Sequence, residues 1–330
     1  MRKQGIKMCA LLFMVMLVMG CGAKEVSPIV EQDDVVEITQ IESPEEIEVE
    51  VEEQDVSLTQ DRAGNDIVVP ENITSIISLA PAFTEVIIDL GLTDYLVAVD
   101  TNSAMLSGLP EGIIQVDMMS PDMEQLAILE PDILFASTLT TWEGTELFEP
   151  LLDMGVCVVE IPTSSSISAI QDDILFMGNV LSCTEGAVEI VFEMQSNIDA
   201  ITQIAGTITN KKTVIFEIAS SPDIYSMGSG TFIDEMITLV GATNAIGDQE
   251  GWISLSAESE VNANPDVILT NVNYIEDPVF EILTRSGYEE VTAIQESFVY
   301  YIDTNTSSVP NHNIVKALWE MAEAIYPESY

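Results

Sequence analysis

Two stretches of the chain repeat one another and constrain its architecture more than any other feature. They are Ser120 to Ser137 (SPDMEQLAILEPDILFAS) and Ser254 to Asn271 (SLSAESEVNANPDVILTN). In each, a Ser precedes a Glu by four residues, and Pro-Asp and an apolar run follow seven residues after that Glu. The apolar run is typical of a buried strand, and the residues before it favour a short helix. The copies lie too far apart for a solenoid, whose period is roughly 20–50 residues. They predict two similar lobes, each with one carboxylate at the same place, Glu124 and Glu258.

Strand and helix patterns alternate through both halves of the folded region. Strands are expected at 73–79, 95–99, 156–161, 213–218 and 298–302, with helices at 83–90, 146–154, 232–240, 278–285 and 313–324. A hairpin is expected over 57–69. Alternation of this kind favours parallel sheets with helices on both faces. We therefore predict an α/β fold of two Rossmann-like lobes with mostly parallel sheets and a ligand cleft between them.

The connection between the halves reads as one long helix. From Thr184 to about Thr209 there is no Pro, and apolar residues recur at helical spacing. A helix over 184–210 would be roughly 40 Å long at 1.5 Å per residue, enough to span two domains. A stiff connection of this kind limits hinge closure, so we expect a largely pre-formed cleft.

The N-terminal segment indicates export. Residues 1–20 combine a basic start with an apolar run that is too short to span a membrane, as in a signal peptide. The run ends at Gly20-Cys21 and resembles a bacterial lipoprotein signal, which would leave Cys21 lipidated; the alternative is a plain secretory signal. Residues 21–56 are then an acidic, disordered tether, because 24–56 hold thirteen acidic residues and one Lys. The expected domains are an N-terminal lobe (57–183), a linking helix (184–210) and a C-terminal lobe (211–330).

Charge and cysteine content narrow the possible partners. After signal removal, six basic residues face 56 acidic ones, a net charge of −50. Nucleic acid is excluded as a partner, because phosphate binding needs clustered Lys and Arg. The spacing of Cys157 and Cys183 matches no metal-binding or redox motif. The two cysteines either form a disulfide or are two buried free thiols.

The stretch Ile76 to Glu85 (IISLAPAFTE) resembles the opening of the helical-backbone substrate-binding proteins of ABC importers, which serve ferric siderophores, haem and cobalamin. The paired Glu/Pro-Asp units, the long helix, the lead-in Gly251 to Ser254 and the lipoprotein start fit the same pattern. The resemblance implies a monomeric protein that is lipid-anchored on the extracytoplasmic face of the cell membrane. It would deliver a small-molecule ligand to a permease dimer with its ATPase subunits. Glu124 and Glu258 would dock on that permease, since two like charges on one face suit a two-fold partner.

Ligand contacts are expected from loops at the carboxyl ends of the strands, where open α/β sheets place their crevices. These loops are 78–82, 100–103, 118–119 and 137–142 in the first lobe, and 220–225, 251–252, 271–274 and 304–308 in the second. Aromatic side chains in polar loops would suit a flat macrocycle or a chelate. The candidate ligand-binding residues are Ser78, Pro81, Asn102, Met118, Trp142, Tyr225, Trp252, Asn271 and Tyr274.

Departures from the family pattern restrict the ligand. Asp100-Thr101-Asn102 and Met118-Met119 stand where relatives that bind haem or cobalamin often carry an aromatic residue, so axial ligation of haem is not favoured. His312 is the only histidine, which rules out a three-His metal site, and no resident metal or cofactor is expected. The basic residues are too scattered for citrate or catecholate siderophores. A neutral or cationic chelate remains, a cobalamin or related corrinoid, or a ferric hydroxamate siderophore, with haem or another iron complex as the alternative. The chain has no nucleophile elbow, phosphate loop or dinucleotide fingerprint, so an enzyme or a surface adhesin is the weaker reading.

Overall fold

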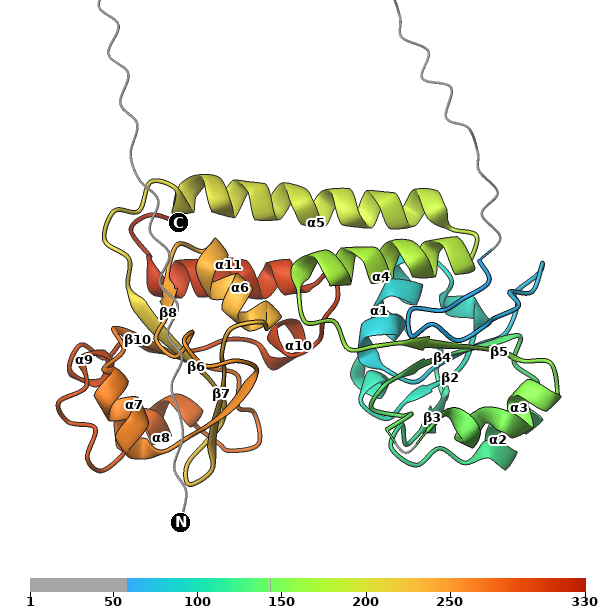
Figure 1. Ribbon diagram of the computed structural model, residues 1–330, viewed down its shortest axis with the longest axis horizontal. Coiled ribbons are helices and arrows are strands. Elements are labelled where there is room, and N and C mark those ends of the chain that lie inside the picture. The colour runs from blue at the N-terminus through green and yellow to red at the C-terminus, as the bar shows by residue number, and fades with distance from the viewer. Residues whose placement is uncertain (1–57, 143) are drawn as a thin grey trace, which may run out of the picture. The chain divides into compact units, whose positions relative to one another are not determined.

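The computed structural model describes residues 58–142 and 144–330 (Figure 1). The signal peptide, Cys21 and the tether lie outside the described residues. The described residues form a compact unit that carries two lobes. No helix within this part of the chain is long and apolar enough to cross a membrane.

The first lobe contains a parallel sheet, ordered β3-β2-β1-β4-β5 within the described residues. Its strands are β1 (Ile76–Ser78), β2 (Leu96–Asp100), β3 (Ile114–Val116), β4 (Ile133–Ser137) and β5 (Cys157–Ile161). Every residue of β1 and β4 is buried, as continuous apolar strands covered on both faces should be. Helices α1 (Pro81–Asp89) and α4 (Ile167–Val180) cover one face, and α2 (Met123–Ile128) and α3 (Glu149–Asp153) the other (Figure 1). Short 3₁₀ turns occupy Thr93–Tyr95, Ser103–Met105 and Thr145–Phe148.

The second lobe contains a mixed sheet, ordered β11-β10-β6-β7-β9, with β8 paired to β6. Its strands are β6 (Thr213–Ala219), β7 (Ile224–Met227), β8 (Thr243–Asn244), β9 (Trp252–Leu255), β10 (Val267–Thr270) and β11 (Val299–Tyr301). Its helices are α6 (Phe232–Leu239), α7 (Ala257–Ala263), α8 (Pro278–Leu283), α9 (Thr292–Gln295), α10 (Thr304–Ser307) and α11 (Ile314–Ile325). β7 pairs antiparallel with β6 and β9, whereas the remaining pairings are parallel. The two lobes together confirm the predicted α/β fold.

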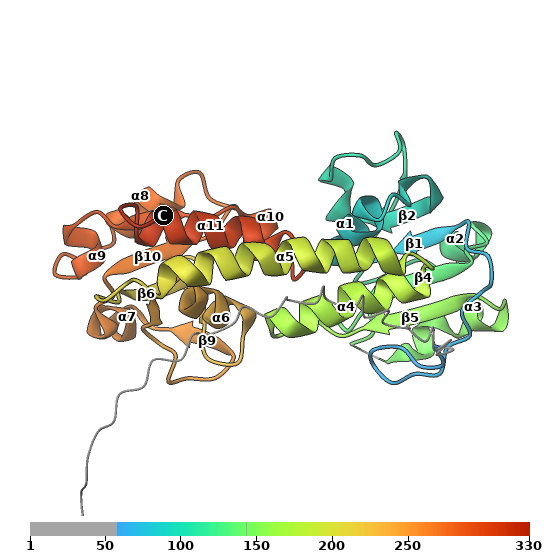
Figure 2. The same ribbon diagram turned by 90° about the horizontal axis from the view of Figure 1, so that it is seen from above.

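A long helix, α5 (Thr184–Ala205), runs across both lobes (Figures 1 and 2). It ends at Ala205 rather than at 210, with Gly206 at the C-cap position, and its 22 residues span about 33 Å. It packs on α4 in the first lobe and on α6 and α11 in the second. Gly178 of α4 lies so close to Ala187 of α5 that a Cβ at position 178 would overlap the Ala187 side chain.

One buried apolar cluster continues from the first lobe to the second. It includes Ile76 of β1, Met194 and Ile201 of α5, Val214 of β6 and Leu318 of α11. A protein interior packs at crystal-like density, so a core shared by both lobes resists relative motion between them. This continuity agrees with the expectation of a stiff connection.

Several local expectations differ from the structure in extent. The N-terminal hairpin is a single bridge between Gln60 and Asp66. The helix expected at 146–154 is a 3₁₀ turn followed by α3. Cys157 and Cys183 are both free, with Cys157 buried and Cys183 half-buried. Burial, with the nearby charge of Asp61, raises the pKa of the Cys157 thiol to about 11, which makes it a poor nucleophile.

Candidate functional site

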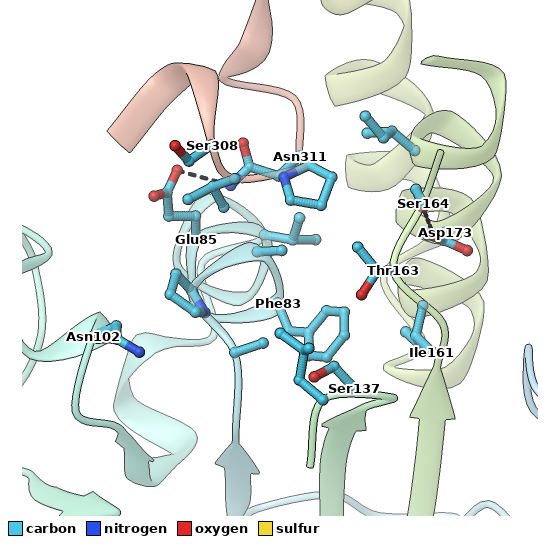
Figure 3. Close-up of a pocket in the computed structure, with 18 of the residues that line it drawn as sticks. Phe83, Glu85, Asn102, Ser137, Ile161, Thr163, Ser164, Asp173, Ser308 and Asn311 are labelled. Carbon is cyan, nitrogen blue, oxygen red and sulfur yellow. Dashed lines mark hydrogen bonds between the residues drawn. The ribbon is translucent and has the colours of Figure 1, made fainter. Parts of the chain in front are cut away.

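A cavity of about 480 Å³ lies between the two lobes (Figure 3). Its wall is mostly apolar and comes from the start of α1, the loop after β5, α4, and the segment before α11. The lining residues include Ala80, Pro81, Phe83, Val86, Leu106, Leu139, Ile161, Ile170, Ile174 and Met177 from the first lobe, and Trp252, Thr304, Asn305, Ser308, Val309 and Asn311 from the second. An apolar cavity with a few polar groups is the usual form of a small-molecule site.

Local sequence explains how the first lobe forms this wall. Pro81 begins α1, where its missing N–H costs no hydrogen bond. α1 therefore starts directly after β1, and Phe83 in its first turn lies at the cavity. In α4, Ile170, Ile174 and Met177 recur at spacings of four and three residues, which places them on one face toward the same space.

Asp173 interrupts this apolar face of α4. Its Oδ1 accepts from Arg62 Nε at 2.6 Å, and its Oδ2 accepts from the hydroxyl of Ser164 (Figure 3). Burial raises the pKa of Asp173 even though Ser164 and Arg62 oppose that shift. Asp173 is therefore a carboxylate on the cavity wall whose burial Arg62 and Ser164 offset only in part.

Glu85 of α1 is the second carboxylate of the cavity. Its Oε2 accepts from Asn311 Nδ2 at 3.0 Å (Figure 3). It also accepts from Asn313 Nδ2, and both asparagines lie in the turn that leads into α11. No cation neutralises Glu85 in the part of the chain that the structure describes. Ser137, at the end of β4, adds a buried hydroxyl that has no hydrogen-bond partner within the described residues. A bound ligand could use both groups.

The cavity carries no positive charge on its described wall. Neither Lys, Arg nor His occurs among the lining residues, whereas Glu85 and Asp173 both do. Arg285, one of the few basic residues, is bound elsewhere by Glu217, Glu260 and Glu281. The described lining offers an anionic ligand no cation, because Arg62 lies outside it and is already paired with Asp173, so the cavity favours neutral or cationic molecules.

The structure places four of the nine candidate ligand residues on the cavity wall. These are Pro81, Asn102, Met118 and Trp252. The Nδ2 of Asn102 lies 3.8 Å from the Sδ of Met118, so the two side chains support each other at the end of the first-lobe sheet. Trp252 is 73% exposed and is the aromatic residue that the second lobe presents to the cavity.

The other five candidates are not among the lining residues. Ser78 is fully buried, and its hydroxyl accepts from Thr84 Oγ1 at 2.8 Å. Asn271 donates to Ser307 and Ser308 at 3.0 and 2.9 Å, and therefore positions the loop that carries Ser308.

The three remaining candidates are aromatic residues that are exposed to different extents. Trp142 and Tyr225 are 66% and 40% exposed, and Tyr274 is 64% exposed while its hydroxyl accepts from the Ser220 N–H at 2.9 Å.

Sequence reasoning missed the two charged lining residues because both lie on helices rather than in strand-end loops. Glu85 is the last residue of the stretch Ile76 to Glu85 that carries the family resemblance, but that resemblance assigns it no role. Asp173 could have been found as an acidic residue inside the apolar stripe of Ile170, Ile174 and Met177. Neither signal shows from sequence that the side chain lies on a cavity.

Glu124 and Glu258 occupy matching positions in the two lobes. Each is the second residue of a short helix, α2 or α7, and follows a capping residue, Asp122 or Ser256. Both side chains are exposed, and neither has a hydrogen-bond or ion-pair partner among the described residues. Figure 1 shows α2 and α7 on the side of each lobe that faces away from α5.

Comparison with known proteins agrees with this architecture. A family model described as periplasmic binding protein matches residues 76–306. An uncharacterised ABC transporter substrate-binding lipoprotein of Bacillus subtilis, YvrC, is 28% identical over 333 residues, which cover 100% of this chain and 99% of its own length. A vitamin B12-binding protein of Vibrio cholerae is 24% identical over 253 residues, 74% of this chain and 86% of its own.

A solved structure gives the same result for the fold. A protein of Staphylococcus epidermidis, described as a possible iron-binding (periplasmic solute-binding) protein, superposes with a TM-score of 0.70 at 29% identity, covering 78% of this chain and 100% of its own. With two lobes, a connecting helix and a cavity between the lobes, this chain belongs to the periplasmic binding protein family and is a substrate-binding protein of the ABC-transporter type.

Proposed function

We propose that this protein captures a metal chelate outside the cytoplasm and delivers it to an ABC permease. The chelate is a cobalamin or related corrinoid, or a ferric hydroxamate siderophore, and the corrinoid is favoured. The observation that carries this proposal is the interlobe cavity, which is apolar, contains Glu85 and Asp173, and has no basic residue among its described lining.

The charge of the cavity separates the candidate ligands. Haem carries two propionates, and citrate and catecholate siderophores are anionic, so each would need a cation that the described lining lacks. Tyr and His, common axial ligands of haem iron, are also missing from the lining as far as the structure describes it. A corrinoid with neutral amide side chains would meet apolar wall and the hydrogen-bonding groups of Asn102 and Ser137. The vitamin B12-binding relative of Vibrio cholerae supports the same choice.

The ligand is tested by titrating the purified protein with cyanocobalamin, ferrichrome and haemin while following tryptophan fluorescence. Trp252 lines the cavity and should report binding. Saturable quenching by cyanocobalamin or ferrichrome, with no response to haemin, is expected. Saturable binding of haemin with neither of the others would refute the charge argument.

Delivery is proposed to depend on Glu124 and Glu258. Their equal positions on α2 and α7 would present two negative charges to a two-fold permease, which favours orientation and association rate more than affinity. Glu124→Ala with Glu258→Ala should abolish ligand uptake by cells and leave ligand affinity within about two-fold, because neither residue lines the cavity. Glu189→Ala with Glu193→Ala, on α5, is the matched control and should transport normally. Normal uptake by the Glu124/Glu258 variant would exclude the docking role.

Attachment to the membrane is proposed to depend on Cys21. Replacement by Ala would remove the thiol that carries the lipid, so the protein should move from the membrane fraction to the medium. Cys9→Ser, within the expected signal, should leave the protein attached. Membrane retention of Cys21→Ala would show that lipid on Cys21 does not hold it there.

A further inference from the structure

The first helix of each lobe carries a glutamate at an equivalent position. Glu85 of α1 lies six residues before Gly91, and Glu235 of α6 lies six residues before Gly241. Both glycines end their helices with a positive φ, +77° and +89°. Each lobe therefore carries a Glu at the equivalent position of its first helix.

Glu85 reaches the second lobe. Its Oε2 accepts from Asn311 and Asn313, and Asn313 directly precedes the first residue of α11. One turn further along α1, Asp89 Oδ2 lies 2.6 Å from His312 Nε2. One face of α1 thus contacts the turn that begins the last helix of the other lobe.

Glu235 makes the reciprocal contact. Its Oε2 accepts from the backbone N–H of Ile167 at 2.6 Å, and Ile167 is the first residue of α4, the last helix of the first lobe before α5. The first N–H groups of a helix have no partner within it, and a carboxylate there also interacts favourably with the helix dipole. Figure 2 shows α6 beside the start of α4.

We propose that Glu85 and Glu235 are positioning residues that fix the distance between the lobes, and thereby the width of the ligand cavity. Each forms an interlobe clasp, defined here as a carboxylate on the first helix of one lobe bound to the start of the last helix of the other. The two clasps join different pairs of elements, α1 with the turn before α11 and α6 with the start of α4, so separation of the lobes would stretch both.

The two clasps differ in their access to ligand. Glu85 lines the cavity, and Glu235 is not among the lining residues. A ligand group that donates to Glu85 can therefore loosen the first clasp while the second holds. This proposal concerns the lobes themselves and stands whichever ligand is bound.

The test uses the ligand-free protein and compares lobe orientation by residual dipolar couplings of the backbone amides. In the parent, both lobes should fit one alignment tensor. In Glu85→Ala, Glu235→Ala and the double variant, each lobe should still fit its own tensor, which shows that it is folded, while the two tensors diverge. Glu85→Gln and Glu235→Gln keep an acceptor oxygen and should restore most of the agreement.

Amide exchange at Ile167 gives a second readout. Exchange should quicken about ten-fold or more in Glu235→Ala, because the hydrogen bond to a charged acceptor is lost, and should change little in Glu85→Ala. Glu189→Ala, an exposed α5 variant, controls for loss of one negative charge and should match the parent in both measurements. A single tensor for both lobes in the two single alanine variants would overturn the proposal, since the clasps would then not set the lobe geometry.

Discussion

At the residue scale, a single cation, Arg285, pairs with three carboxylates in the second lobe. Arg285 forms a bidentate pair with Glu217 at 2.7 and 2.7 Å and also contacts Glu260 and Glu281. Glu217 and Glu260 are fully buried, and Glu260 Oε1 has no partner among the described residues. Burial and the neighbouring charge of Glu260 raise the pKa of Glu217 despite Arg285. The folded protein therefore holds protons here that the unfolded chain would release.

This excess charge predicts a pH dependence of stability. The folded-state pKa of Glu217 lies above its unfolded value of 4.5. Its contribution to the free energy of unfolding is therefore complete below pH 4.5 and is lost as pH rises through the folded-state pKa. Glu260→Gln removes one cause of the raised pKa, so the variant should lose less stability between pH 5 and pH 8, by on the order of 1 kcal/mol. Urea unfolding at several pH values measures the difference.

The control is Glu258→Gln, which changes an exposed residue of the same helix and should keep the parental pH dependence. If the stability of Glu260→Gln and that of the parent changed equally with pH, the charge of Glu260 would not be a cause of the raised pKa of Glu217.

The repeated Pro-Asp shows how far single residues could be interpreted from sequence. The repeat predicted equivalent lobes but gave no role to its Asp residues. Asp132 accepts from the N–H and hydroxyl of Thr74 at 2.7 and 3.0 Å, and Asp266 does the same to Thr213 at 2.8 and 2.9 Å. Each therefore ties the start of one central strand to the next, a contact that only the folded sheet brings together. The role of Ser78 was similarly hard to predict, since its side chain is buried and accepts a hydrogen bond from Thr84 instead of lining the cavity.

At the element scale, α5 could be predicted because its signal is local. A long stretch of helical periodicity without Pro needs no tertiary information. The short strands β7 and β9 were harder, because their antiparallel pairing joins residues on either side of α6. That Glu85 and Asp173 line the cavity could not be predicted, since cavity walls depend on how helices pack.

Close packing of α4 against α5 predicts a cost for enlarging Gly178. Ala at this position would overlap the Ala187 side chain, so Gly178→Ala should lower the free energy of unfolding by about 1–3 kcal/mol. Gly206→Ala is the matched control, because its added Cβ would meet only ordinary contacts at 3.5 Å and its φ is −61°. That variant should be unchanged or slightly more stable, by up to about 1 kcal/mol. Urea unfolding compares them, and an equal effect of both substitutions would contradict close packing at Gly178.

At the scale of the whole molecule, the shared core, the long helix and the cavity between the lobes belong to one arrangement. The core passes from β1 through α5 to β6, and the interlobe contact of Glu85 lies at the cavity. Such an arrangement favours a cavity that exists before ligand arrives. Two lobes and a rigid connection were predictable from sequence, whereas the chemistry of the wall required the structure.

The most direct test of this account is the affinity for cyanocobalamin when the cavity is filled. Thr163 lines the cavity and is exposed, so Thr163→Trp should occupy the ligand volume without disturbing the core. Ser165→Trp, two residues away and not part of the lining, is the control. The account predicts saturable binding by the parent and the control, and at least a ten-fold loss for Thr163→Trp. Failure of the parent to bind, or equal binding by all three proteins, would contradict it.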